Sequence, residues 1–177
     1  HVHMTMGNYP SALKEIDNGI NLEPNSGNML STKSQYLAHR GKIDDAIKVA
    51  QAGISRNPSF IRVYEALAQA HLKAGDYDSA LKAVEQGDDL YPGEYQLIKA
   101  RIMASRGDRA ETNLLLDKEI KKKGVDVISS TQIARVFYLL NEDIKVLDYL
   151  ELAIKEKDPY ITYLHVNFDW NRISDSQ

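Results

Sequence analysis

The sequence contains no cysteine among its 177 residues. This absence excludes disulfide bonds, zinc sites built from thiolates and catalytic cysteines. A chain without cysteine suits the cytosol and the periplasm equally well, so cysteine usage leaves the compartment open. We favour the cytosol, because no signal-peptide pattern opens the sequence.

Long apolar runs and a surplus of positive charge are also missing. No stretch approaches the roughly 20 apolar residues of a transmembrane helix, so we expect no membrane partner. Lys and Arg total 22 against 25 Asp and Glu, which gives a net charge of −3. A surface that binds phosphate groups normally carries a basic surplus, so nucleic acid is not expected as a partner of this segment.

Catalytic and metal-binding motifs are absent as well. The sequence has no Walker loop, no dinucleotide glycine motif and no GxSxG elbow, and its five histidines form no HExxH or i, i+4 pair. The acidic pairs at 44–45 and 142–143 fall at predicted helix starts, where carboxylates cap helices, whereas 88–89 is expected to be solvated surface. The basic run 121–123 is expected to oppose a helix dipole. We therefore expect no enzyme, no cofactor and no metal site.

What the sequence does contain is a repeat. Glycines recur 34 residues apart at Gly7, Gly41 and Gly75. Three more columns share this spacing: Ala12, Ala46 and Ala80; Gly19, Gly53 and Gly87; and Pro24, Pro58 and Pro92. Apolar residues between these columns follow a helical periodicity and nowhere the alternation of a strand. The pattern predicts a stack of helical hairpins.

Each column has a physical role in such a hairpin. The first glycine permits a positive φ where one helix ends and the next begins. The alanine column lets the two helices approach, and the second glycine column implies a still closer contact between backbones. The prolines end the second helix of each hairpin. In the fourth unit we expect the first helix at about 94–106 and a turn at Gly107. Thr112 is expected to take the place of the small residue in the alanine column, called the small column below.

The residues Tyr64, Leu67-Ala68, Gly75-Asp76-Tyr77, Ala80 and Pro92 resemble the tetratricopeptide repeat. The resemblance implies an all-α right-handed solenoid of antiparallel helix pairs, with a short C-terminal capping helix. It further implies one domain over residues 1–177, with a partial repeat at 1–26, full repeats at about 27–60, 61–94, 95–126 and 127–159, and a cap at 160–177. The cap would contain Tyr160, Tyr163, Phe168 and Trp170. Because residues 1–6 match only the end of a first helix, we expect further sequence before His1.

The family register also implies which side chains line a concave groove. These candidates come from the first helix of each repeat: Gln35, His39, Arg62, Gln69, Lys73, Lys99, Met103, Arg106, Arg135 and Tyr138. The predicted groove holds five Lys or Arg residues and one acidic residue, Glu65. We hypothesise that it binds an acidic or carboxylate-bearing peptide, and the alternative is that these cations are ordinary solvated surface.

Chaperone-binding members of the family hold a terminal carboxylate with a Lys/Asn/Arg clamp. The matching positions here are Ser31, Gln35, Ala66, Gln96 and Ala100, so that clamp is absent. A looser resemblance covers the C-terminal part, where Asp158-Pro159 and Phe168-Asp169-Trp170-Asn171-Arg172 are similar to the end of repeat regions in bacterial regulators. It implies a sensory or regulatory interaction module in a signalling protein. The alternative is a structural scaffold, or a homodimer assembled through the end faces.

Overall fold

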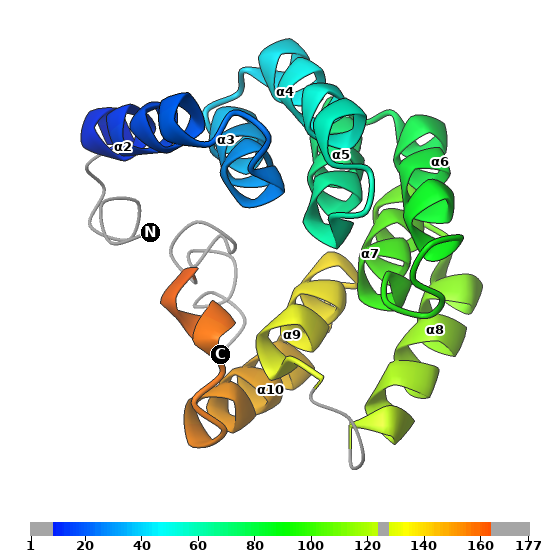
Figure 1. Ribbon diagram of the computed structural model, residues 1–177. Coiled ribbons are helices and arrows are strands. Elements are labelled where there is room, and N and C mark those ends of the chain that lie inside the picture. The colour runs from blue at the N-terminus through cyan, green and yellow to red at the C-terminus, as the bar shows by residue number, and fades with distance from the viewer. Residues whose placement is uncertain (1–8, 124–127, 164–177) are drawn as a thin grey trace. The chain divides into compact units, whose positions relative to one another are not determined.

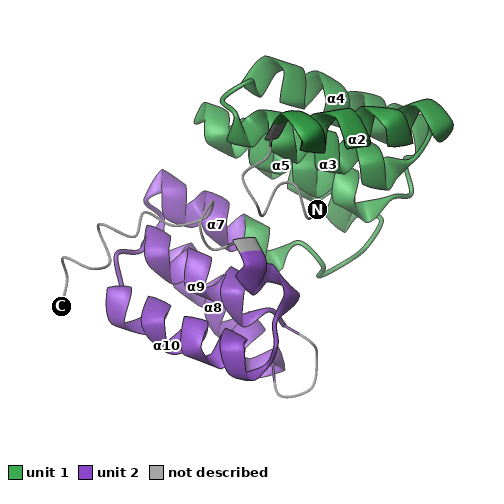
Figure 2. Ribbon diagram, turned by 90° about the vertical axis from the view of Figure 1, so that its left-hand side faces the viewer, with its two compact units in different colours: residues 1–98 green, residues 99–177 purple. Residues whose placement is uncertain are grey.

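The computed structural model describes residues 9–123 and 128–163. The chain divides into two compact units, residues 1–98 and residues 99–177, shown in green and purple in Figure 2. Every regular element in the described residues is a helix, which confirms the all-α prediction. Whether these two units act as one domain is not decided by this division, so the single-domain assignment stays a prediction.

The described residues of unit 1 form helices α2 to α6, which Figure 1 labels along the chain. They are α2 (Tyr9–Leu22), α3 (Gly27–His39), α4 (Ile43–Arg56), α5 (Ile61–Ala74) and α6 (Tyr77–Asp88). Helices α3 and α4 form one hairpin, and α5 and α6 form the next. Helix α5 packs against both α3 and α4, so the second hairpin stacks on the first. The core of these hairpins includes alanines with no exposed surface, Ala46, Ala50, Ala68 and Ala80, beside larger apolar side chains such as Val63.

Unit 2 continues the alternation of helices. Helix α7 (Gln96–Arg106) begins at the end of unit 1 and runs into unit 2, where α8 (Arg109–Lys122), α9 (Ser130–Leu139) and α10 (Asp143–Lys155) follow. A 3₁₀ helix, η1 (Pro159–Tyr163), contacts both α9 and α10. Phe168 and Trp170, the other aromatic residues of the expected cap, lie outside the described residues.

The turns between paired helices have the predicted backbone. Gly41, Gly75 and Gly107 have φ values of 74°, 75° and 90°, a region that residues with a Cβ atom rarely adopt. At the turn between α9 and α10, Asn141 takes the same conformation with a φ of 59°. Gly7, the first member of this column, lies outside the described residues.

The second glycine column packs differently from the expectation. A Cβ atom on Gly53 would lie 2.8 Å from Val63 Cγ1, and one on Gly19 would lie 2.9 Å from Met29 Sδ. At Gly87 the added atom would overlap the ring of Tyr95. The close neighbour is therefore a side chain in, or just before, the first helix of the next hairpin, and the prediction of a backbone contact was wrong. Glycine leaves space for an inserted bulky side chain here.

The fourth repeat follows the prediction with one shift. Its first helix begins at Gln96, two residues later than the expected start, and ends at Arg106 just before the Gly107 turn. Thr112 occupies the small column with no exposed surface, and its hydroxyl donates to the Asp108 carbonyl oxygen at 2.6 Å. This hydrogen bond lets a polar residue replace the alanine of the other repeats.

Two charged segments have roles that the sequence did not reveal. Asp88 Oδ1 accepts a hydrogen bond from the Gly93 amide at 2.8 Å, so this carboxylate fixes the loop after α6 and is not merely solvated. Lys123 reaches beyond its own helix end: its Nζ contacts both carboxylate oxygens of Glu156 at 2.7 Å and the Ile128 carbonyl oxygen at 3.0 Å. The basic run therefore links the end of α8 to the end of α10.

Candidate peptide-binding faces

The first helices of the hairpins, α3, α5, α7 and α9, carry a charge bias. In these four described helices Lys or Arg occupies seven positions and Glu65 is the single acidic residue. The second helices, α4, α6, α8 and α10, are mixed instead, with eleven acidic and nine basic residues. We call the exposed sides of α3 and α5 the unit 1 face, and those of α7 and α9 the unit 2 face.

On the unit 1 face, two helices that pack together present the candidate residues. Gln35 and His39 on α3 are half-buried, and so is Gln69 on α5. Arg62 and Lys73 stand exposed towards the two ends of α5. Gln69 Nε2 donates to Glu65 Oε1 at 2.8 Å, which holds the amide in place and occupies the one acidic group of the face.

On the unit 2 face, the candidates differ in exposure. Lys99, Arg135 and Tyr138 are half-buried and Arg106 is exposed, whereas Met103 is only 6% exposed. Arg106 Nη2 lies 3.3 Å from Met103 Sδ and 3.5 Å from Asp108 Oδ2. Arg135 Nη1 donates to Gln132 Oε1 at 3.2 Å along its own helix. No acidic residue stands on α7 or α9, so the positive charge of this face is not compensated within those helices.

Two of the cations are available for a ligand. Within the described part of the chain, the side chains of Arg62 and Lys99 make no hydrogen bond or ion pair. By contrast, Lys33 on α3 is paired with Asp17 Oδ1 at 2.7 Å, and Arg101 on α7 is only 8% exposed. The sequence could not separate these cases, because helical spacing shows which face a residue occupies but not what it meets there.

Small side chains at other groove positions of the family register serve the packing between helices. Ser31, Ala66 and Ala100 are between 0% and 2% exposed. Ser34, which the sequence did not single out, is also fully buried, and its hydroxyl donates to the Ala46 carbonyl oxygen at 2.8 Å, joining α3 to α4. Three of the five positions that would carry the chaperone clamp therefore hold packing residues, and the other two are the half-buried Gln35 and Gln96.

A polar contact outside these two faces stabilises the turn between α5 and α6. His71 Nδ1 lies 3.5 Å from Asp76 Oδ2, at the turn between α5 and α6. A hydrogen bond with Ser79 lowers the pKa of Asp76, and His71 adds a smaller contribution in the same direction. Among the described residues, no group of three His, Asp or Glu side chains is placed to hold a metal ion. No described helix is long and apolar enough to cross a membrane.

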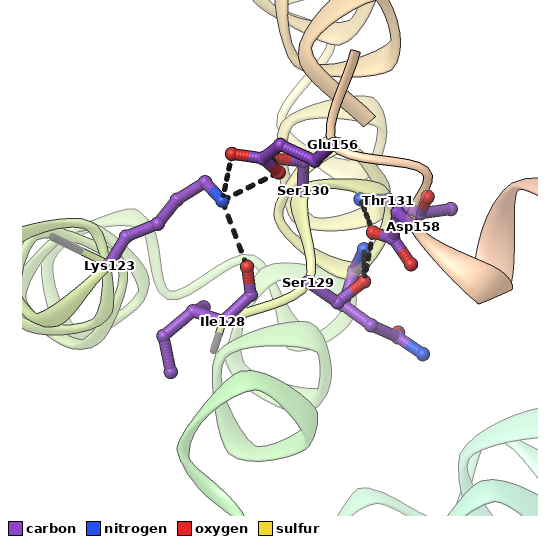
Figure 3. A network of polar contacts seen from close by, with 8 residues as sticks. Lys123, Ile128, Ser129, Ser130, Thr131, Glu156 and Asp158 are labelled. Atoms are coloured by element: carbon purple, nitrogen blue, oxygen red, sulfur yellow. Dashed lines mark hydrogen bonds and ion pairs between the residues drawn. The ribbon is translucent and has the colours of Figure 1, made fainter. Parts of the chain in front are cut away.

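A polar network closes the C-terminal end of the described chain (Figure 3). Asp158 Oδ2 accepts hydrogen bonds from the Ser129 hydroxyl at 2.6 Å and from the Thr131 amide at 2.9 Å. Burial acts to raise the pKa of Asp158, but these hydrogen bonds and one from the Tyr160 amide outweigh it and lower the pKa. Hydrogen bonding from Lys123 likewise lowers the pKa of Glu156. The network ties the start of α9 to the end of α10.

Comparison with known proteins identifies the repeats. A family model described as "Tetratricopeptide repeat" matches residues 37–102. Tetratricopeptide repeat protein 33 of Xenopus laevis is 28% identical over 91 residues, which cover 51% of this chain and 35% of that protein. Small glutamine-rich tetratricopeptide repeat-containing protein 2 of Mycosarcoma maydis is 27% identical over 103 residues, or 58% of this chain and 29% of that protein. The chain thus spans about a third of the length of these relatives.

A solved structure has the same fold. A tetratricopeptide repeat protein from Parabacteroides merdae matches with a TM-score of 0.65 at 13% sequence identity, over 88% of this chain and 61% of that one. This likeness confirms the helical solenoid class that the period predicts. By the family model over residues 37–102 and by these relatives, the chain is similar to tetratricopeptide repeat proteins.

Proposed function

We propose that this chain is a non-catalytic module that binds acidic protein segments on the first helices of its hairpins. Tetratricopeptide repeats serve in protein–protein interaction, and the charge bias of this chain supports an acidic partner. The observation that carries the proposal is the charge bias of α3, α5, α7 and α9: besides the paired Lys33 and the buried Arg101, these helices carry five Lys or Arg residues and a single acidic residue. Charge-assisted hydrogen bonds from Arg and Lys are the interactions that recognise carboxylates.

The two faces would contribute differently. On the unit 1 face Glu65 already bonds Gln69, so this face offers Arg62 and Lys73 together with the glutamine amides. The unit 2 face offers Lys99, Arg106 and Arg135 with no acidic residue on the same helices. The half-buried ring of Tyr138 supplies apolar contact area beside this charge. We therefore expect the unit 2 face to provide the larger share of the affinity.

The test is a binding titration with a fluorescein-labelled peptide of alternating Glu and Gly, read by fluorescence anisotropy. The double variant Lys99→Glu, Arg135→Glu should weaken binding at least about tenfold, because each reversal replaces an attraction by a repulsion. A matched control, Lys82→Glu with Lys118→Glu, reverses two exposed lysines on the second helices α6 and α8 and should leave binding unchanged. Equal effects of the two pairs would reject the proposal.

The finer role that we propose is regulatory, within a bacterial signalling or transcription-regulating protein. Its support is the similarity of Asp158-Pro159 and the residues after it to the ends of such repeat regions. Asp158 has a structural reason to be present, because it caps α9. The protein sequence encoded upstream of this chain tests the role. A winged-helix, cyclase or kinase domain there would support it, and further repeats alone would contradict it.

One observation favours assembly as a second function. On α10 the side chains of Ile144 and Ile154 are 79% and 65% exposed, which is high for isoleucine in a helical repeat. A second copy of the chain could bury them in a homodimer. Light scattering over a dilution series tests this, with Ile154→Asp as the variant. A mass that stays monomeric at every concentration would exclude a scaffold formed by self-association.

A further inference from the structure

A depression in unit 1 lies apart from the candidate faces, among the loops that connect successive hairpins. It measures about 510 Å³, within the roughly 300–1,000 Å³ of small-molecule sites, and opens to solvent. The loop between α2 and α3 forms one side, and Asn57 and Phe60 from the loop between α4 and α5 form the other. Its lining residues are Glu23, Pro24, Asn25, Ser26, Gly27, Asn28, Asn57 and Phe60.

The repeat supplies an internal standard for this depression, because two backbone hydrogen bonds recur in each connecting loop. The amides of Glu23, Asn57 and Tyr91 donate to the carbonyl oxygens of Gly19, Gly53 and Gly87, each at 2.9 Å. Three residues further on, the amides of Ser26, Phe60 and Glu94 close the same turn with donor–acceptor distances of 3.0, 3.1 and 3.3 Å. Side chains at equal places in successive loops can therefore be compared directly.

The next pair of loops along unit 1, α4–α5 and α6–α7, forms the equivalent junction. There a tyrosine occupies the place that is open in this depression. The Tyr91 hydroxyl donates to the Ser59 carbonyl oxygen, and the Tyr95 hydroxyl donates to the Ile61 carbonyl oxygen at 2.8 Å. Thirty-four residues earlier, the places of these tyrosines are taken by Asn57 and Ile61, which have no phenol. The Asn25 carbonyl oxygen takes the place of that of Ser59, and no described residue donates a hydrogen bond to it.

We propose that this depression binds a tyrosine side chain supplied by a protein partner. The ring would lie against the ring of Phe60, and the hydroxyl would donate to the Asn25 carbonyl oxygen, as Tyr91 does one repeat later. Phe60 is itself fixed, because its ring covers Gly27 so closely that a Cβ atom there would lie 2.6 Å from ring carbons. The wall of the site is thus already formed before any ligand arrives.

The lining of this depression differs in charge from the unit 1 and unit 2 faces, which are proposed to bind acidic segments. Glu23 is the one charged residue that lines it, and none of the cationic candidates does. The Arg56 guanidinium beside the depression already donates to the Pro24 carbonyl oxygen at 2.9 Å. A neutral phenol matches the amide groups, backbone carbonyls and aromatic ring of the lining. The inference therefore does not depend on the proposed function of the helix faces.

The probe is N-acetyl-L-tyrosinamide, titrated into the intact chain while backbone amide shifts are followed by NMR. We expect concentration-dependent shifts at Ser26, Gly27, Asn28 and Phe60. N-acetyl-L-phenylalaninamide should bind about fivefold more weakly, since it lacks the hydroxyl that a neutral carbonyl oxygen accepts. The variant Asn57→Tyr should fill the depression from within and abolish the shifts. Gln51→Tyr, which adds a tyrosine at an exposed position of α4 outside the lining, should leave them intact.

A reverse variant keeps the test independent of how well Asn57→Tyr folds. Tyr91→Asn removes the tyrosine of the next junction and should create a second set of shifts around residues 58–62. The absence of shifts in the unaltered protein up to the solubility limit of the probe would overturn the proposal. So would an equal response of Asn57→Tyr and Gln51→Tyr, or equal affinity for the two amides.

Discussion

Ala80 illustrates how a single position controls the packing of a hairpin. It lies in α6 with no exposed surface, in the small column that also contains Ala46. The substitution Ala80→Glu would place a carboxylate in a core that offers no compensating charge. We expect it to lower the free energy of unfolding by at least about 3 kcal/mol. Urea denaturation followed by circular dichroism measures the loss.

The control for this substitution is Lys82→Glu on the exposed side of the same helix. It introduces the same side chain without burial, and surface changes of this kind usually fall within about 0.5 kcal/mol. If both variants unfolded at the same urea concentration, the packing register given for α6 would be wrong.

Gly53 tests the contact between successive hairpins. In an open helix Gly→Ala gains roughly 0.5–1 kcal/mol, but here the new methyl group would lie 2.8 Å from Val63 Cγ1 and 3.4 Å from Leu30 Cβ. Overpacking of this kind costs about 1–3 kcal/mol, so we expect Gly53→Ala to be destabilising. Adding Val63→Ala should make the double variant more stable than the sum of the two single effects predicts. Thermal unfolding of the unaltered protein, the two single variants and the double variant measures this coupling.

At the scale of helices and turns, the turn after α10 contains a non-glycine residue with a positive φ. Lys157 follows α10 with a φ of 55°, a conformation that costs a residue with a Cβ atom roughly 1–2 kcal/mol. Lys157→Gly should therefore raise the thermal unfolding midpoint. Gly107→Ala provides the opposite case, since its φ is 90° with open space around it, and it should lower the midpoint by strain alone. A midpoint unchanged in both variants would contradict this account of the turns.

The Asp158 network predicts an acid-dependent stability of the last hairpin. The pKa of Asp158 is lower in the folded chain than the ordinary value of 3.8. The unfolded state therefore takes up a proton first, so the stabilisation is present above pH 3.8 and is lost as the pH falls through the lowered pKa. Asp158→Asn removes this titration. Between pH 6 and pH 3, it should lose less stability than the unaltered chain in urea denaturation at each pH.

For the whole molecule, the two proposed sites should respond differently to salt. Charges on the helix faces act over a screening length of about 10 Å at 0.1 M salt and about 3 Å at 1 M. Binding of the acidic peptide should therefore weaken steadily as sodium chloride is raised. Binding of tyrosinamide in its nearly uncharged depression should change little. Anisotropy and NMR titrations at several salt concentrations check this, and a common salt dependence would contradict the assignment of two chemically distinct sites.

The relative importance of the two units can be measured in the same chain. Lys99→Glu with Arg135→Glu alters unit 2, whereas Arg62→Glu with Lys73→Glu alters unit 1. Their comparison shows how far each face contributes to binding. The unit 2 pair should have the larger effect, because its helices carry no acidic residue to offset the positive charge.

The sequence by itself determined the period, the helical class and the turns. A spacing of 34 residues, repeated in several columns, requires the same local geometry each time, and Gly41 and Gly75 share nearly the same φ, 74° and 75°. The tertiary structure decided which neighbours those columns meet. Gly87 is a space for Tyr95, Lys123 reaches Glu156 and the Asn25 carbonyl oxygen lacks the tyrosine that serves Ser59. The contacts of Lys123 with Glu156 and of Tyr91 with Ser59 join residues 33 and 32 positions apart, and they depend on how hairpins stack rather than on any pattern along the chain.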